Sequence, residues 1–230
     1  MTTRATPYQF AVLAALALVS AAGLTACDSR PTPAPTPSAS ASSTPEARAT
    51  PTPTPVVPGA IVVNGAGVEV NAIDSTSIVR IPYTTDGVTA AALFSDAIGV
   101  EPVVTDIAGD GNGCFGDYRS YDWGGIQFFS PGDVYAPAGQ LFNAIVTASA
   151  TTGGLELATV ARQQIGAPTA DFVAAVGGEL QVDVAGTTFV NFDRQNPGAP
   201  ASDAWGAVAV AQGGAISRIV APLHFYGDSC

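Results

Sequence analysis

The sequence predicts an α+β fold, built mainly on an antiparallel sheet with a few short helices on one of its faces. Short runs of β-branched and aromatic residues recur along the chain, and glycine, Asn and Asp turns separate them. These strand-like runs outnumber the segments in which apolar residues have helical spacing. The order of strand, short helix and antiparallel strands then recurs in the second half of the chain, which indicates two similar half-units.

The first segment, residues 1–26, has the pattern of a bacterial lipoprotein signal peptide. Arg4 is the single positive charge before an apolar run at residues 10–22, and this run is too short to span a bilayer, which takes about 20 apolar residues. The run leads to the lipobox Leu24-Thr25-Ala26-Cys27, in which the Cys27 thiol is the acceptor of a diacylglyceryl group. We therefore expect a palmitate-type lipid anchor at Cys27 on the extracytoplasmic face of the cell membrane.

A low-complexity tether is expected at residues 27–58. It is rich in Pro, Thr and Ser and has almost no aliphatic or aromatic side chains, so burial cannot offset the entropy cost of ordering it. Alternating prolines favour a polyproline II conformation with a rise of about 3.1 Å per residue, which gives the tether a reach of roughly 95 Å. O-glycosylation of its hydroxyl groups is compatible with this composition. A single folded domain, residues 59–230, follows the tether.

The first half of the domain is expected to open with a hairpin that turns at Asn64-Gly65. A helix should begin at the cap Asp86 and end at Gly99, and Gly124-Gly125 is expected to form a bulge within one long strand. The expected strands are residues 61–64, 67–70, 77–83, 101–107, 121–129 and 141–150, and the expected helix is residues 88–98.

The second half of the domain is expected to contain a short helix at residues 170–176, with Thr169 as its N-cap and Gly177 after its end. Turn signals at residues 183–186 and 212–214 separate the strand candidates that follow. The expected strands are residues 179–184, 187–192, 205–211 and 215–221.

Two cysteines remain after lipidation of Cys27. Cys114 and Cys230 allow one pairing, and an exported domain folds in an oxidising compartment, so we expect a disulfide between them. A catalytic or metal-binding thiol is the alternative. It has little support, because His224 is the only histidine and the usual metal sites need three or four ligands.

The formal net charge of −11 argues against nucleic acid as a partner, because an acidic chain repels phosphate backbones. All eight basic residues are Arg, and together with abundant Ala, Gly, Pro and Val this is typical of a GC-rich genome, such as that of an actinobacterium. No cofactor is expected.

The order of features resembles that of uncharacterised actinobacterial lipoproteins. The resemblance rests on the lipobox, the tether, the YxWGG-type strand at residues 121–125, the helix entry at residues 166–168 and a Cys near the end. Families of this kind imply no activity. The order of elements is also similar to the β-lactamase-inhibitor-like fold, with which envelope lipoproteins grip other proteins.

An oxygen-rich loop surrounds Cys114 and is a weak candidate for a Ca²⁺ site. Its candidate ligands are Asp106, Asp110, Asn112 and Asp117. Neither possible register satisfies the EF-hand pattern, because Ala108 or Cys114 falls on a ligand position. A glycine loop with turn-forming Asp and Asn is the simpler interpretation.

Aromatic residues cluster between residues 115 and 129, and three of them form the candidate binding surface: Tyr118, Tyr121 and Trp123. Exposed rings here could stack on sugar rings or on a partner protein. The alternative is that alternate members point into the core, as a strand requires.

Catalytic motifs are missing from the sequence: it has no Gly-x-Ser-x-Gly, no His-Glu-x-x-His and, without Lys, no Ser-x-x-Lys. We therefore expect a cell-surface lipoprotein with a non-catalytic domain that binds an envelope protein or glycan. A wall-polymer hydrolase that uses a pair of Asp or Glu residues is the alternative, and a structural spacer is another.

Overall fold

The computed structural model of this protein describes residues 56–109, 116–131, 137–183, 186–200 and 203–225. These residues all belong to one compact unit, Thr52–Cys230. Cys27, Cys114 and Cys230 lie outside the described residues, as do the signal segment and most of the tether. Lipidation and the disulfide therefore stay predictions.

A four-stranded sheet contains the start of the domain, in the order β3-β2-β1-β8. The predicted opening hairpin is confirmed, because β1 pairs with β2 in antiparallel fashion. Its strands are β1 (Pro58–Asn64), β2 (Gly67–Ala72), β3 (Ser77–Pro82) and β8 (Glu156–Ala158). The pairing of β1 with β8 is parallel, so the sheet joins segments almost a hundred residues apart.

The turn between β1 and β2 is held by the side chain of Asn64. Its Oδ1 accepts hydrogen bonds from the backbone N–H groups of Ala66 at 2.8 Å and Gly67 at 3.0 Å. Asn at this position therefore forms a side-chain turn, which explains why the sequence signal marks the turn correctly.

An eight-stranded antiparallel sheet forms the larger part of the domain, in the order β4-β5-β6-β7-β12-β11-β10-β9. Its strands are β4 (Val103–Ile107), β5 (Tyr118–Asp122), β6 (Ile126–Ser130), β7 (Asn143–Val146), β9 (Glu179–Val182), β10 (Thr188–Phe192), β11 (Trp205–Gln212) and β12 (Ala215–His224). The last four confirm the strands predicted for the second half of the chain.

Two helices are present in the described residues: α1 (Gly87–Ile98) and α2 (Thr169–Val176). The predicted ends of α1 are confirmed, since Asp86 accepts a hydrogen bond from the Thr89 N–H and Gly99 closes the helix at φ +69°. None of the helices in these residues is long and apolar enough to cross a membrane.

Two sequence predictions about local structure are wrong. Gly124 and Gly125 do not form a bulge: with φ values of +71° and +105° they are the turn of a hairpin between β5 and β6, which the Trp123 N–H closes on the Ile126 carbonyl. Thr169 is the first residue of α2 and not its N-cap, which is Pro168 without a side-chain hydrogen bond.

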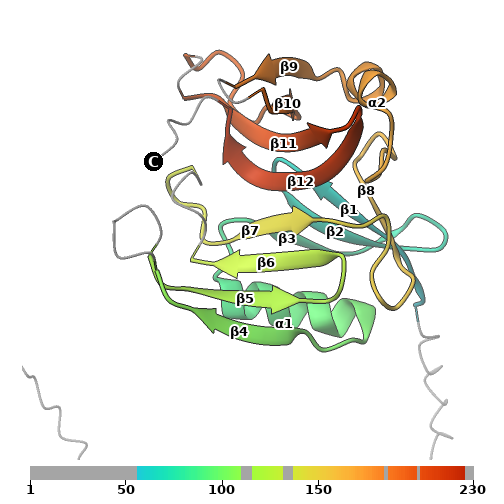
Figure 1. The fold of residues 1–230 in the computed structure, drawn as a ribbon. Helices are drawn as coiled ribbons and strands as arrows, with labels where there is room; N and C mark the ends of the chain where they lie inside the picture. The colour runs from blue at the N-terminus through green and yellow to red at the C-terminus, as the bar shows by residue number, and fades with distance from the viewer. Residues whose placement is uncertain (1–55, 110–115, 132–136, 184–185, 201–202, 226–230) are drawn as a thin grey trace, which may run out of the picture. The chain divides into compact units, whose positions relative to one another are not determined.

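The main hydrophobic core lies between the two sheets and the helices, and a smaller cluster contains Ala204, Val208 and Phe225. In Figure 1, α1 and the four-stranded sheet both lie behind the eight-stranded sheet. Phe94 of α1 contacts the rings of Phe128 and Trp123, and Phe172 of α2 contacts Phe192, on the same face of that sheet. The fold is thus mainly β, with two sheets where the sequence analysis expected one, and with its helices on one face.

Tyr83 in this core should make the protein less stable in alkali. It is 1% exposed and its hydroxyl donates a hydrogen bond to the Asn64 carbonyl at 3.1 Å. Burial, together with the charge of Asp193, raises the pKa of Tyr83 well above 10.0. The folded state therefore holds the neutral phenol, and the unfolded state gains stability by ionising once the pH exceeds about 10.

We expect the free energy of unfolding, measured with urea, to fall more steeply above pH 10 in the wild type than in Tyr83→Phe. The substitution removes the titrating group while retaining the ring. Equal slopes in the two proteins would show that Tyr83 ionises as easily in the folded state as in the unfolded state.

Candidate functional site

Trp123 lies in the core and does not contribute to an exposed binding surface, contrary to one of the predictions above. It is 3% exposed, and its Nε1–H donates to the Val100 carbonyl at 3.1 Å and to Ser95 Oγ at 3.3 Å. Its ring packs edge-on against Phe94 and Phe128, with centroids 4.6 and 4.8 Å apart. The alternative reading, that alternate aromatic residues point inward, is correct for Trp123.

Tyr118 and Tyr121 lie on the same strand, β5, at different depths. Tyr118 is half-buried, and its ring packs at 61° to the ring of Phe129 on β6, with a centroid distance of 5.4 Å. Tyr121 is 6% exposed and is the register partner of the core residue Phe128. Because the two tyrosines are three positions apart, they leave opposite faces of the strand.

Both tyrosines nevertheless line one cavity, which we name the tyrosine pocket. It has a volume of about 600 Å³ and lies where β4, β5 and β6 come close to the first turn of α1. Its lining includes Asp106, Asp117, Tyr118, Arg119, Tyr121 and Ser130. Two of the three predicted surface residues are thus brought together with two of the predicted calcium ligands.

An ion pair crosses this pocket between neighbouring strands. Arg119 Nε lies 2.6 Å from Asp106 Oδ1 and Arg119 Nη2 lies 3.1 Å from Oδ2, which is a two-pronged hydrogen bond between register partners. The hydrogen bond from Arg119 lowers the pKa of Asp106, and the same bond raises the pKa of Arg119, with a smaller contribution from Tyr121. Both groups are therefore charged at neutral pH.

The calcium candidates are not assembled into a site by the described residues. Asp106 is bound by Arg119, and Asp117 accepts a hydrogen bond from the Gly109 N–H at 2.8 Å. Asp110 and Asn112 lie outside the described residues. No group of three or more His, Cys, Asp or Glu side chains is positioned to hold a metal within the described part of the chain.

Arg119 lines the pocket but was not among the residues predicted from the sequence. The predicted strand begins at Tyr121, whereas β5 begins at Tyr118. A signal was present, because Asp106 and Arg119 carry opposite charges on the two sides of the glycine-rich loop, where a hairpin would pair them.

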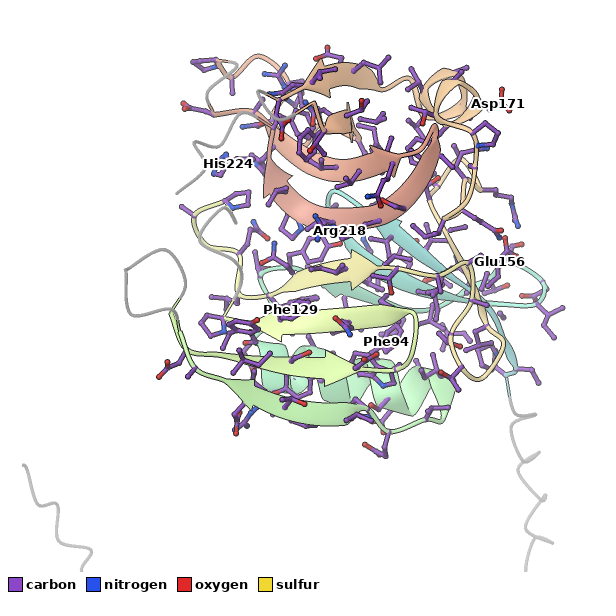
Figure 2. All side chains as sticks on the ribbon, in the orientation of Figure 1. Phe94, Phe129, Glu156, Asp171, Arg218 and His224 are labelled. Carbon is purple, nitrogen blue, oxygen red and sulfur yellow. The ribbon has the colours of Figure 1, made fainter. Side chains whose placement is uncertain are left out.

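His224, the single histidine, is the last residue of β12 and is half-buried. It is labelled in Figure 2, and its Nδ1 is buried without a hydrogen-bond partner among the described residues.

The chain matches no protein-family model, no curated protein and no solved structure. Any proposal about function therefore depends on the geometry of the site and on the sequence signals.

Proposed function

We propose that this protein is a lipoprotein anchored through Cys27 to the extracytoplasmic face of the cell membrane, with a non-catalytic domain that binds an envelope glycan or protein. The lipobox and the tether support the location, and a tether of roughly 95 Å would let the domain reach into the cell wall. The acidic net charge of −11 is compatible with such a role and unfavourable for nucleic acid.

The tyrosine pocket is the observation that carries the binding proposal. Tyr118 and Tyr121 both line this pocket, and tyrosine combines an apolar ring that can stack on a sugar with a hydroxyl that can donate and accept hydrogen bonds. The paired Asp106 and Arg119 side chains add charged acceptors and donors within the same cavity. Apolar surface with a few fixed polar groups, in a volume of about 600 Å³, is typical of a small-ligand site.

The same ion pair argues against the hydrolase alternative at this pocket. Glycoside hydrolysis needs one carboxylic acid with a raised pKa to protonate the leaving group. Arg119 instead lowers the pKa of Asp106, so this carboxyl is ionised and already hydrogen-bonded at neutral pH. Asp106 is therefore unsuited to the role of that general acid.

The strand order supports the expectation of two similar half-units. In each half a helix precedes four antiparallel strands in sequence order: α1 precedes β4–β7, and α2 precedes β9–β12. The two sets meet where β7 pairs with β12, the last strand of each set. We infer a domain made of two such units, similar in its order of elements to β-lactamase-inhibitor-like domains.

Replacing the half-buried Tyr118 should weaken binding without unfolding the domain. We expect Tyr118→Ala, in the full chain solubilised in detergent, to bind isolated wall glycan of its own bacterium about tenfold more weakly, which is about 1.4 kcal/mol. Binding would be measured by co-sedimentation with the insoluble glycan and by titration with soluble fragments.

Val103→Ala is the matched control, because Val103 is 71% exposed on the neighbouring strand β4 and does not line the pocket. Equal affinity of Tyr118→Ala and wild type would remove the tyrosine pocket as the binding site. Retention by wall that survives protease treatment would identify a glycan, whereas retention by untreated envelope that protease treatment abolishes would identify a protein partner. Retention by neither would leave the spacer role.

A further inference from the structure

A second cavity lies at the opposite end of the central strands, and we name it the arginine pocket. It has a volume of about 850 Å³ and lies where the ends of β10, β11 and β12 approach the first residue of α2. Its lining includes Thr147, Thr169, Thr187, Thr188, Ser217 and Arg218. Thr147 lies just after the C-terminal end of β7. The tyrosine pocket lies beside the C-terminal end of β6, which is next to the N-terminal end of β7 because the two strands are antiparallel. The two cavities therefore lie at opposite ends of β7.

Arg218 gives this cavity a local positive charge in an acidic protein. Among the described residues that line the cavity there is no Asp or Glu, although the chain has 19 acidic and 8 basic residues. Within the described residues Arg218 has no ion pair, whereas Arg80 and Arg119 are each paired with a carboxylate. Figure 2 shows Arg218 on β12, and its side chain is exposed to solvent. Its guanidinium is therefore free to bind an anion.

The rest of the wall is rich in hydroxyl groups. Four threonines and one serine surround the cavity. Ser217 Oγ donates to the Val210 carbonyl at 3.1 Å, so its lone pairs remain free to accept. The Oγ1 of Thr169 is buried and has no hydrogen-bond partner in the described part of the chain.

We propose that the arginine pocket binds an anionic saccharide, a sugar that carries a carboxylate or a phosphate. A guanidinium binds either group through two parallel hydrogen bonds, and the threonine and serine hydroxyls match the hydroxyl groups of the sugar ring. A volume of about 850 Å³ lies within the range of small-ligand sites. This site has its own residues and does not depend on the tyrosine pocket.

The test uses the full chain in detergent, titrated with four probes: glucuronic acid, glucose 6-phosphate, methyl glucoside and inorganic phosphate. We expect the first two to bind, as measured by calorimetry and by amide chemical-shift changes at residues 186–188 and 210–218. Arg218→Ala should weaken both by about tenfold or more, because a hydrogen bond to a charged group is lost. Raising the salt concentration should weaken them as well.

Arg80→Ala is the charge-matched control, because Arg80 is exposed and lies outside this cavity. Tyr118→Ala should leave glucuronic acid binding unchanged, which separates this proposal from the tyrosine pocket. Thr188→Val, which retains the charge, should weaken glucose 6-phosphate and leave inorganic phosphate unaffected. Methyl glucoside or inorganic phosphate bound as tightly as glucose 6-phosphate would overturn the proposal, and so would unchanged affinity in a folded Arg218→Ala.

Discussion

Phe128→Ala is expected to lower the free energy of unfolding by about 3–5 kcal/mol, which is the usual cost of emptying an aromatic site in a core. Phe128 has no exposed surface, and its ring lies at the centre of an aromatic cluster. Its centroid is 5.0 Å from that of Phe94, 4.8 Å from that of Trp123 and 4.8 Å from that of Phe142. These neighbours come from α1, from a turn and from a loop, so the structure cannot collapse locally to fill the space.

The measurement is equilibrium unfolding in urea, followed by circular dichroism. Phe129→Ala is the matched control, because Phe129 is the next residue on β6 and, with the alternation of the strand, points to the opposite and half-exposed face. We expect its cost to be about a third of that of Phe128→Ala. Similar costs for the two substitutions would mean that the core does not lie on the side of the sheet that faces α1.

Gly125→Ala is expected to lower the free energy of unfolding by about 2–5 kcal/mol. Gly125 has a φ of +105°, a region that residues with a Cβ rarely adopt, and this strain contributes about 1–2 kcal/mol. An added Cβ would also lie 2.5 Å from the Ala150 carbonyl oxygen and 3.1 Å from Ala148 Cβ. Such overpacking adds about 1–3 kcal/mol, because the nearest atom belongs to the backbone and cannot rotate away.

Gly139→Ala separates these two causes. Gly139 has a similar φ of +85°, but an added Cβ would meet no atom within 4 Å. Gly139→Ala should therefore lower the free energy of unfolding by the backbone strain alone, about 1–2 kcal/mol. Thermal unfolding of both variants and the wild type in one buffer measures the difference. If both substitutions lower the free energy of unfolding equally, the segment between β7 and β8 that contains Ala150 can move away from the β5–β6 turn.

The candidate site shows where sequence patterns succeed and where they fail. The aromatic run at residues 118–129 correctly points to the region of the tyrosine pocket, because strong strand formers define the hairpin. The pattern allowed both an exposed and a buried position for Trp123, and it predicted a bulge where the Gly124-Gly125 turn in fact ends the hairpin strand β5. Once the turn is known, the burial of Trp123 beside Phe94 follows from the packing of α1.

The arginine pocket is beyond the reach of the sequence patterns. Three segments that are distant in the chain supply Thr147, Thr169 and Arg218. The pairing of β12 with β7 and the packing of α2 bring these segments together. Nothing in the local sequence around any of them marks a site. Only the register of the strands makes Arg218 the charge of a cavity lined by hydroxyl groups.

The sequence alone determines the features whose causes are local. The Asn64 turn, the Asp86 cap of α1 and the alternating strands of the second half depend on side chains within a few residues of one another. The tertiary structure decides the division into two sheets and the parallel pairing of β1 with β8. Pairing between distant segments is stabilised by the apolar surface that they bury against each other. This burial depends on both segments at once, so the pattern of either segment alone does not predict it.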